Sequence, residues 1–309
     1  MLNILFAAKS EKWTEYEAPL KEAFAAHGLE VTLSTDMAAD VVDYIIYAPN
    51  SGLDDFTPFT HCKAVLNLWA GVEDVVGNPT LTMPLARMVD PGLTEGMVEY
   101  VTGHVLRHHL GMDAHITNPD RAWIDTPPPL ARDRKVAILG LGALGSACAS
   151  ALAALNFDVH GWSRSAKDVT GVTCHAGDAG LMSAVDGAHF IVLLMPLTPE
   201  TENLISTDVM CRFAPGACLI NPGRGPLIDD EALLAALDTG EVAHATLDVF
   251  RTEPLPPEHP FWSDPKITVT PHIASTTRPA SAARTIAANI AGHERGEPLR
   301  NLVDRGKGY

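Results

Sequence analysis

The sequence predicts an α/β protein with two parallel-sheet domains, one of them inserted into the other. The chain has 309 residues, which is enough for two domains of ordinary size. Short apolar runs alternate with helical patterns along both halves, as in parallel sheets covered by helices. A last helical pattern at 278–296 follows the final strand and can cross back to cover the first domain. We therefore expect one domain from residues 1–96 with 280–309 and a second from 97–279.

The expected strands form two series. The first series is LNILFAA near the start, VDYIIYA (42–48), AVLNLW (64–69) and PLARMV (84–89). The second is KVAILG (135–140), FDVHGW (157–162), AHFIVLLM (188–195), ACLIN (217–221), VAHATLDVF (242–250) and KITVTPH (266–272). Strands of the second series are almost continuously apolar, as burial on both faces requires. A long helix is expected between the series, at about 94–112.

Composition narrows the possible partners and the compartment. Asp and Glu number 38 against 22 Lys and Arg, so the net charge of −16 repels nucleic acid and anionic membranes. A small anionic substrate can still bind where cations and backbone amides are gathered locally. The five cysteines form no C-x-x-C pair, which indicates free thiols in a reducing compartment, the cytoplasm. No apolar run has membrane-spanning length, and MLNILFAAKS is interpreted as the first strand rather than a signal peptide.

A glycine loop follows the strand KVAIL and precedes an alanine-rich helix. Its residues are Gly140, Leu141, Gly142, Ala143, Leu144 and Gly145. In such a loop the first glycine makes the tight turn, the second lets the backbone approach a pyrophosphate, and the third lets helix and strand pack closely. The phosphate then lies on the helix N-terminus. Glycines also collect in ordinary turns, but the order of strand, loop and helix favours a dinucleotide site.

The next strand, FDVHGW, ends at Ser163 and Arg164, where an NAD-binding protein usually has an acid for the ribose 2′-hydroxyl. A hydroxyl and a guanidinium suit a 2′-phosphate instead, and Ser165 and Lys167 can add a donor and a charge. We therefore expect NADP(H) in preference to NAD(H). The alternative is that Arg164 is a solvated surface residue.

Three polar residues lie at or just beyond strand ends, where open α/β sheets bind ligands. They are Arg224, Glu253 and His272. An arginine can bind a carboxylate and a carbonyl, and a histidine can donate a proton near neutral pH. A carboxylate beside the imidazole would orient it and favour its charged form. Taken singly, each has a structural alternative: a turn anchor, an exposed loop acid and a histidine at a strand end.

The motifs GLGALG, INPGRGPLIDDEALLAAL, LDVFRTEPLP and TPHIAS resemble the D-isomer-specific 2-hydroxyacid dehydrogenase family. HGWSRS, MPLTPETENLI, PHIASTTRP and VDRGKGY resemble its glyoxylate/hydroxypyruvate reductase A branch. The resemblance implies two Rossmann/flavodoxin-like domains, the dinucleotide-binding domain inserted into the substrate-binding domain, and a homodimer built partly through the long helix. It also implies that Arg224, Glu253 and His272 are catalytic.

Further residue roles follow from the same resemblance. A loop at Trp69, Ala70 and Gly71 would hold the substrate carboxylate through the last two amides. Asp248 would contact the nicotinamide carboxamide, although capping a strand end is the alternative. Pro196 would lie near the cofactor ribose. Tyr47 lies where this branch has an aromatic residue at the substrate pocket, although a core tyrosine is an alternative.

The sequence thus predicts an NADPH-dependent reductase of small 2-oxo acids, glyoxylate or hydroxypyruvate first. Two alternatives are the same chemistry on a bulkier phenyl- or branched-chain 2-oxo acid, and a nicotinamide-sensing binding protein. His104 and His108 are four residues apart on the long helix, a spacing that two metal ligands can have. No third ligand is evident, so we expect no metal and place both histidines on a helix surface or subunit contact.

Overall fold

The computed structural model describes residues 1–308 and divides the chain into two compact units. Unit 1 consists of Met1–Leu93 and the segment that begins at Thr276, and unit 2 consists of Thr94–Ser275. The predicted boundaries, 96/97 and 279/280, lie near these divisions. That the units are a substrate-binding and a dinucleotide-binding domain stays a prediction.

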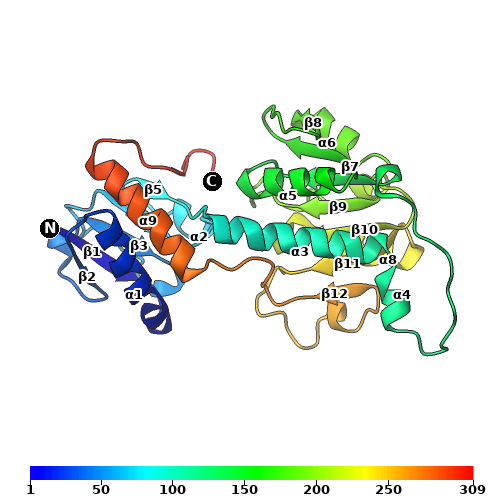
Figure 1. The fold of residues 1–309 in the computed structure, drawn as a ribbon, viewed down its shortest axis with the longest axis horizontal. Coiled ribbons are helices and arrows are strands. Elements are labelled where there is room, and N and C mark those ends of the chain that lie inside the picture. Colours follow the sequence, from blue (N-terminus) through cyan, green and yellow to red (C-terminus); the bar gives the residue numbers. More distant parts are fainter. Residues whose placement is uncertain (309) are drawn as a thin grey trace. The chain divides into compact units, whose positions relative to one another are not determined.

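Unit 1 contains a five-stranded parallel sheet of order β2-β1-β3-β4-β5. Its elements are β1 (Leu2–Ala7), α1 (Ser10–Ala26), β2 (Val31–Ser34), β3 (Tyr44–Tyr47), β4 (Ala64–Asn67), α2 (Glu73–Val76), β5 (Leu85–Ala86) and α9 (Pro279–Glu294), with 3₁₀ turns at Ala39–Val41 and Pro49–Ser51. Helices α1 and α9 lie together on one face (Figure 1), where Phe24 and Ile286 are buried with Phe6 of β1. The return of the last helix to the first unit is therefore confirmed.

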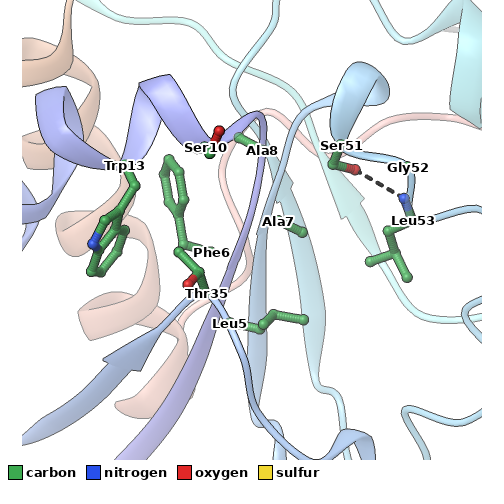
Figure 2. Close-up of a pocket in the computed structure, with 10 residues that line it drawn as sticks. All are labelled: Leu5, Phe6, Ala7, Ala8, Ser10, Trp13, Thr35, Ser51, Gly52 and Leu53. Atoms are coloured by element: carbon green, nitrogen blue, oxygen red, sulfur yellow. Dashed lines mark hydrogen bonds between the residues drawn. The ribbon is translucent and has the colours of Figure 1, made fainter.

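A cavity of about 420 Å³ opens in unit 1 at the carboxyl end of β1. Figure 2 shows that β1 and the segment after β3 contribute to its lining, together with Trp13 of α1 and Thr35. Ser51 lies on the rim, where its Oγ accepts a hydrogen bond from the Leu53 N–H at 3.2 Å. In the sheet order, β1 and β3 are the central neighbours from which the chain leaves in opposite directions. Open α/β sheets bind ligands at such a switch point.

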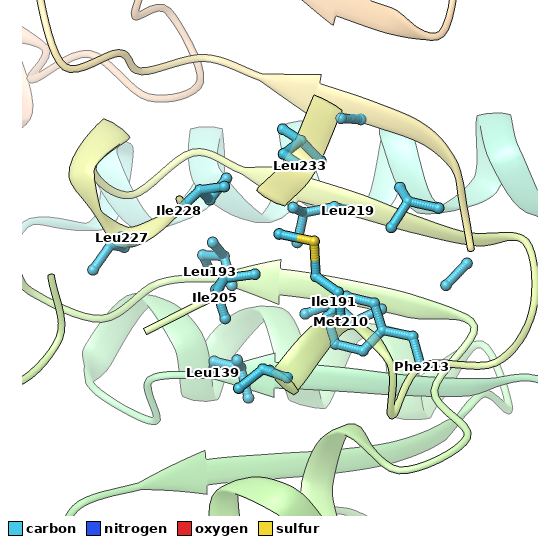
Figure 3. Close-up of a cluster of buried hydrophobic side chains, with 14 of the residues drawn as sticks. Leu139, Ile191, Leu193, Ile205, Met210, Phe213, Leu219, Leu227, Ile228 and Leu233 are labelled. Carbon is cyan, nitrogen blue, oxygen red and sulfur yellow. The ribbon is translucent and has the colours of Figure 1, made fainter. Parts of the chain in front are cut away.

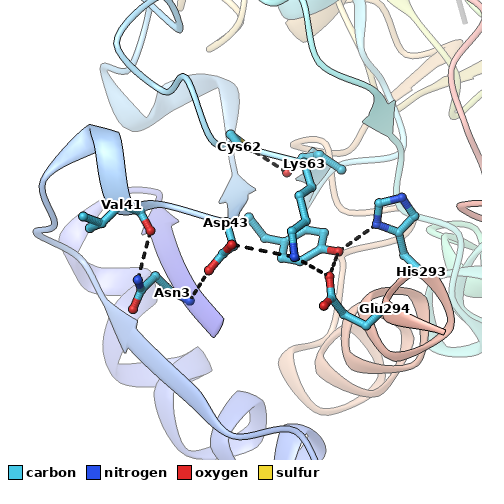
Figure 4. Close-up of polar contacts among 9 residues, drawn as sticks. Asn3, Val41, Asp43, Cys62, Lys63, His293 and Glu294 are labelled. Carbon is cyan, nitrogen blue, oxygen red and sulfur yellow. Dashed lines mark hydrogen bonds and ion pairs between the residues drawn. The ribbon is translucent and has the colours of Figure 1, made fainter. Parts of the chain in front are cut away.

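A polar network lies at the amino ends of β3 and β4 in unit 1. Figure 4 shows Lys63 and Glu294 at its centre, with 2.8 Å between Nζ and Oε1. The Tyr44 hydroxyl donates to Glu294 Oε1 at 2.5 Å and lies 2.7 Å from His293 Nδ1. The Asn3 N–H donates to Asp43 at 2.8 Å. These contacts tie the end of α9 to the sheet.

Unit 2 contains a seven-stranded parallel sheet of order β12-β11-β10-β9-β6-β7-β8. Its elements are α3 (Pro91–His109), which begins in unit 1, α4 (Met112–Ile116), β6 (Lys135–Leu139), α5 (Ala143–Ala154), β7 (Asp158–Ser163), β8 (Thr173–Ala176), α6 (Gly177–Val185), β9 (Phe190–Leu193), α7 (Thr207–Met210), β10 (Ala217–Asn221), α8 (Asp230–Thr239), β11 (Val242–Leu247) and β12 (Ile267–Val269), with 3₁₀ turns at Ala131–Asp133, Gly225–Leu227 and Pro260–Trp262.

The sheet of unit 2 is buried on both faces, as its apolar strands require. One face packs against α3 and α5 through Val101, Val105 and Leu152. Figure 3 shows the core of the other face, where Met210 of α7 and Leu233 of α8 cover strand residues such as Leu219. Two α/β units with parallel sheets are the predicted fold class, which is confirmed.

The structure differs from the predicted elements in a few places. Strands β2 and β8 were not predicted, because they lie at sheet edges and are partly exposed, so their residues are not continuously apolar. Helix α3 begins earlier than expected because Asp90 accepts a hydrogen bond from the Gly92 N–H at 2.8 Å. It ends earlier because Gly111 adopts a left-handed φ of +62°. Within residues 1–308, none of the helices has the length and apolar character that a membrane crossing requires.

Candidate active site

The glycine loop has the geometry that a dinucleotide site requires. Gly140 has a φ of +110°, and a Cβ there would lie 2.5 Å from the backbone of Leu194. A Cβ on Gly145 would lie 1.7 Å from the carbonyl oxygen of Gly140, so strand and helix pack without room for a side chain. A Cβ on Gly142, in contrast, would meet nothing within 4 Å. Space for a ligand therefore lies over Gly142, and the other two glycines form the turn.

Helix α5 begins at Ala143, directly after Gly142, and no side chain caps its N-terminus. The first N–H groups of a helix lack partners within the helix, and the helix dipole favours a negative charge there. The amides of Ala143 and Leu144 can therefore hold a pyrophosphate. The residues present fit a dinucleotide cofactor.

The end of β7 lies beside the glycine loop, because the Gly140 N–H donates to the Trp162 carbonyl at 2.8 Å. Ser163 Oγ donates to the Ser165 carbonyl at 2.7 Å, which makes a tight turn. The side chains of Arg164, Ser165 and Lys167 are exposed beyond it. The pKa of Glu200 is lowered, first by a hydrogen bond with Thr198 and to a smaller extent by the charge of Arg164. Pro196, in the same loop after β9, is half-buried.

A histidine and a glutamate form a hydrogen-bonded pair after the last two strands of unit 2. His272 Nδ1 lies 2.7 Å from Glu253 Oε2, and the Phe250 N–H donates to Glu253 Oε1 at 2.9 Å. A carboxylate can only accept, so Nδ1 carries the hydrogen and Nε2 is the nitrogen available to a substrate. The imidazole is 52% exposed. When both ring nitrogens carry a hydrogen, Nε2 can therefore deliver its proton to a bound molecule.

Asp248 lies directly after β11 and is 0% exposed. Its Oδ1 accepts from the Thr270 hydroxyl at 2.5 Å and from the Ile273 N–H at 2.9 Å, and its Oδ2 accepts from the Ala274 N–H at 2.8 Å. Its carbonyl accepts from the His272 N–H at 2.8 Å. The carboxylate therefore organises the loop that carries the histidine, a role that the strand-end alternative only partly describes.

The loop after β10 carries Arg224, and hydrogen bonds within the loop fix its backbone. Asn221 is fully buried, donates through Nδ2 to the Arg224 carbonyl at 2.8 Å and accepts from the Gly223 N–H at 3.1 Å. Arg224 Nη1 donates to the Gly223 carbonyl at 2.7 Å. A Cβ on Gly225 would lie 2.1 Å from the backbone of Phe250, the residue whose N–H binds the glutamate. The loops after β10, β11 and β12 are thus in contact, as adjacent strands dictate.

In unit 1, the buried side chain of Asn67 fixes the loop of Trp69, Ala70 and Gly71 through hydrogen bonds to its backbone. Asn67 is 1% exposed, and its Nδ2 donates to the carbonyls of Trp69 at 3.1 Å and Gly71 at 2.7 Å. Those carbonyls point toward the core, and within residues 1–308 the N–H groups of Ala70 and Gly71 have no hydrogen-bond acceptor. The loop can therefore bind an anion through its backbone.

Tyr47 is 3% exposed and packs edge-on against Phe56, with 5.5 Å between ring centroids. This position matches the core alternative. Its assignment to the substrate pocket stays a prediction.

Sequence reasoning missed Asn67 and Asn221, which place the two loops. Each is a polar residue at the last position of an apolar strand, namely AVLN and ACLIN. A buried amide at a strand end is satisfied by loop backbone, so this pattern is the signal that could have found them.

His104 and His108 are half-buried on α3, which corrects their placement on a helix surface. His108 Nε2 lies 3.0 Å from the Thr246 hydroxyl, and its ring packs on His244 with 4.8 Å between centroids. Burial lowers the pKa of His108 to about 3, so it is neutral at physiological pH. In residues 1–308, no group of three or more His, Cys, Asp or Glu side chains is arranged to hold a metal ion.

A parallel sheet with a glycine loop after the inner strand β6, and a histidine paired with a glutamate at neighbouring strand ends, are typical of the class of nucleotide-dependent dehydrogenases. The chain belongs to the D-isomer-specific 2-hydroxyacid dehydrogenase family, because residues 104–274 match the model "D-isomer specific 2-hydroxyacid dehydrogenase, NAD binding domain". The protein is accordingly an enzyme of this family.

Several relatives carry a more specific name. The chain is 39% identical to a glyoxylate/hydroxypyruvate reductase A of Serratia proteamaculans (strain 568), over 80% of this chain and 82% of the relative. A D-isomer-specific 2-hydroxyacid dehydrogenase from Xanthobacter autotrophicus Py2, solved with NADPH and MES, superposes with a TM-score of 0.93, 36% identity and 99% coverage of both chains. The NADPH-dependent glyoxylate/hydroxypyruvate reductase of Sinorhizobium meliloti, solved with NADP and sulfate, gives a TM-score of 0.89, 34% identity and complete coverage of both chains (100%).

Proposed function

We propose that this enzyme reduces small 2-oxo acids, glyoxylate and hydroxypyruvate first, with NADPH in preference to NADH, and yields the D-configured product where a centre forms. The hydrogen-bonded pair of His272 and Glu253 is the observation that carries the proposal, because reduction of a carbonyl needs a proton donor. The names of the relatives support the substrate class, and the NADP-bound neighbours support the cofactor.

Each residue has a defined task in the proposed reaction. The amides of Ala70 and Gly71, together with Arg224, hold the substrate carboxylate, and Arg224 polarises the carbonyl. NADPH, when bound, supplies the hydride. His272, with a hydrogen on both ring nitrogens, would protonate the developing alkoxide from Nε2, and Glu253 would accept from Nδ1 and so orient the ring. Gly142, Ala143 and Leu144 would hold the pyrophosphate, and Ser163, Arg164, Ser165 and Lys167 would hold the 2′-phosphate. Pro196 would lie near the ribose, and Asp248 is the residue expected at the carboxamide.

The test of the proposed function compares kcat/KM of NADPH and NADH with glyoxylate, in the wild type and in Arg164→Ala. We expect a strong NADPH preference in the wild type. A hydrogen bond to a charged group contributes about 1.5–3 kcal/mol, so the variant should lose roughly tenfold or more with NADPH and little with NADH. Arg132→Ala removes another exposed arginine of unit 2 and is the matched control.

Other outcomes would redirect the proposal. Equal use of both cofactors by the wild type would make Arg164 a surface residue. Turnover of phenylpyruvate or a branched-chain 2-oxo acid well above glyoxylate would replace the substrate. Nicotinamide binding without turnover of any 2-oxo acid would favour the sensor alternative.

We also propose that the enzyme is a cytoplasmic homodimer assembled partly through α3. The segment after this helix exposes large apolar side chains, including Ile116 at 75%, Trp123 at 93% and Leu130 at 60%. Such a patch is typical of a protein interface. Light scattering should therefore give twice the 33.0 kDa of one chain, and a monomer mass would contradict the proposal. All five cysteines are free, which supports a reducing compartment; cell fractionation tests it.

A further inference from the structure

The backbone at His272 is in an unusual conformation. Its φ is +53°, in the left-handed region that residues other than glycine rarely adopt. A residue keeps such a conformation only where its surroundings impose it. Here the surroundings are Asp248, whose backbone carbonyl accepts from the His272 N–H and whose carboxylate accepts from the N–H groups of Ile273 and Ala274. The position of the imidazole therefore depends on one buried aspartate, and the carboxylate holds the two residues that follow the histidine.

The carboxylate is in turn fixed by a side chain from the adjacent strand. The Thr270 hydroxyl donates its single hydrogen to Asp248 Oδ1 at 2.5 Å. The same hydroxyl oxygen lies 2.7 Å from the Tyr100 hydroxyl of α3. Because the hydrogen of Thr270 is already used, Tyr100 must be the donor in this second bond. Burial raises the pKa of Tyr100 above its ordinary value, so the phenol keeps the hydrogen that it donates.

Helix α3 binds both strands that lead to the site. His108 lies 3.0 Å from the hydroxyl of Thr246, two residues before Asp248. Arg107 Nη1 donates to the hydroxyl of Thr268 at 3.0 Å, two residues before Thr270. Alternate residues of a strand face the same side, so these contacts and the one from Tyr100 share the α3 face of the sheet. Only the contact of Tyr100 continues to the carboxylate that holds the histidine loop.

We propose that Tyr100 is a positioning residue for the reaction, which acts through the hydroxyl of Thr270 and the carboxylate of Asp248 to hold His272 in place for proton transfer. The inference rests on the proposed function, in which His272 is the proton donor. It assigns to a helix residue outside every recognised motif of the chain a role in the chemical step.

The test is Tyr100→Phe, which removes the donated hydrogen and keeps the ring that packs on His104, with 4.4 Å between centroids. We expect kcat for glyoxylate reduction to fall about 3- to 10-fold, the effect of one hydrogen bond, while KM for glyoxylate and NADPH changes less than about twofold. Thr270→Val should lower kcat at least as much, and Thr270→Ser, which keeps the hydroxyl, should restore it. Tyr44→Phe is the control, because it removes a hydroxyl hydrogen-bonded to Glu294 in unit 1.

A second readout does not depend on turnover. Long-range ¹H–¹⁵N spectra report the ring nitrogens of His272, whose signals are assigned from their loss in His272→Ala. Tyr100→Phe should shift these signals and Tyr44→Phe should not. An unchanged kcat with unchanged His272 signals, even if the melting temperature falls as in Tyr44→Phe, would overturn the proposal. If the wild type reduces no 2-oxo acid, the proposed function fails, and the ring signals alone then decide whether Tyr100 positions His272.

Discussion

Replacement of His272 by alanine is expected to lower kcat for glyoxylate reduction by about a hundred- to ten-thousandfold, the contribution of a positioned general acid. The imidazole is half-exposed, and within residues 1–308 its single side-chain hydrogen bond is with Glu253, so the melting temperature should change little. KM for NADPH should also change little, because the role of the ring is in proton transfer. Steady-state kinetics and thermal unfolding of the same preparation measure all three quantities.

Two further variants separate chemistry from backbone effects. Asparagine tolerates a left-handed φ, so His272→Asn keeps the loop conformation and still lacks a transferable proton. It should be as slow as the alanine variant. Glu253→Gln keeps a hydrogen-bond acceptor but loses the charge, and its loss of kcat should be intermediate. If His272→Ala retained most of its turnover, another group would have to donate the proton.

Replacement by alanine of two glycines in the same loop, Gly145 and Gly142, is expected to have opposite effects on the melting temperature and on NADPH binding. Gly145→Ala places a Cβ 1.7 Å from the carbonyl oxygen of Gly140, so the backbone of strand or helix must move. Overpacking of this kind costs about 3 kcal/mol or more, and the melting temperature should fall by several degrees. Gly142→Ala has no atom within 4 Å of its Cβ and a φ of −76°, so the melting temperature should stay unchanged.

Cofactor binding distinguishes the two variants further. In Gly142→Ala the new methyl group occupies the space over the loop that a pyrophosphate would need, and NADPH should bind about tenfold more weakly or worse. Calorimetric titration with NADPH and thermal unfolding measure these effects. Gly103→Ala is the control, because this exposed position of α3 has nothing within 4 Å and alanine favours a helix. Unchanged NADPH affinity in Gly142→Ala would mean that the cofactor does not lie on this loop.

The sequence predicted those features that depend on the local requirements of burial or backbone conformation at a single segment. A run such as KVAIL predicts a strand buried on both faces, and the glycines at 140 and 145 stand where the structure has no room for a Cβ. His272 and Glu253 were predicted to interact from their places at strand ends, and the structure brings them into contact.

What sequence reasoning missed depends on contacts between distant segments. Asn67 and Asn221 are polar residues within apolar runs, and their function is apparent only once their amides are seen to hold loop backbone. Tyr100 lies 170 positions from its partner Thr270, and no local pattern relates them. Strand β8 is partly exposed at a sheet edge, so its composition is ambiguous. Such features follow from tertiary structure and not from spacing.

The positions proposed for chemistry all follow β10, β11 and β12, and they fall within one short stretch of the chain, from Asn221 to Ala274. The loop of Trp69, Ala70 and Gly71, which is proposed to hold the substrate, follows β4, far away in the sequence and in the other unit. Mutations that alter which acid is accepted can therefore accumulate without touching the reaction itself. For protein engineering, a new specificity can be sought by exchanging the segment around Trp69 between relatives. The stretch from Asn221 to Ala274, which carries the residues proposed for the reaction, would stay unchanged.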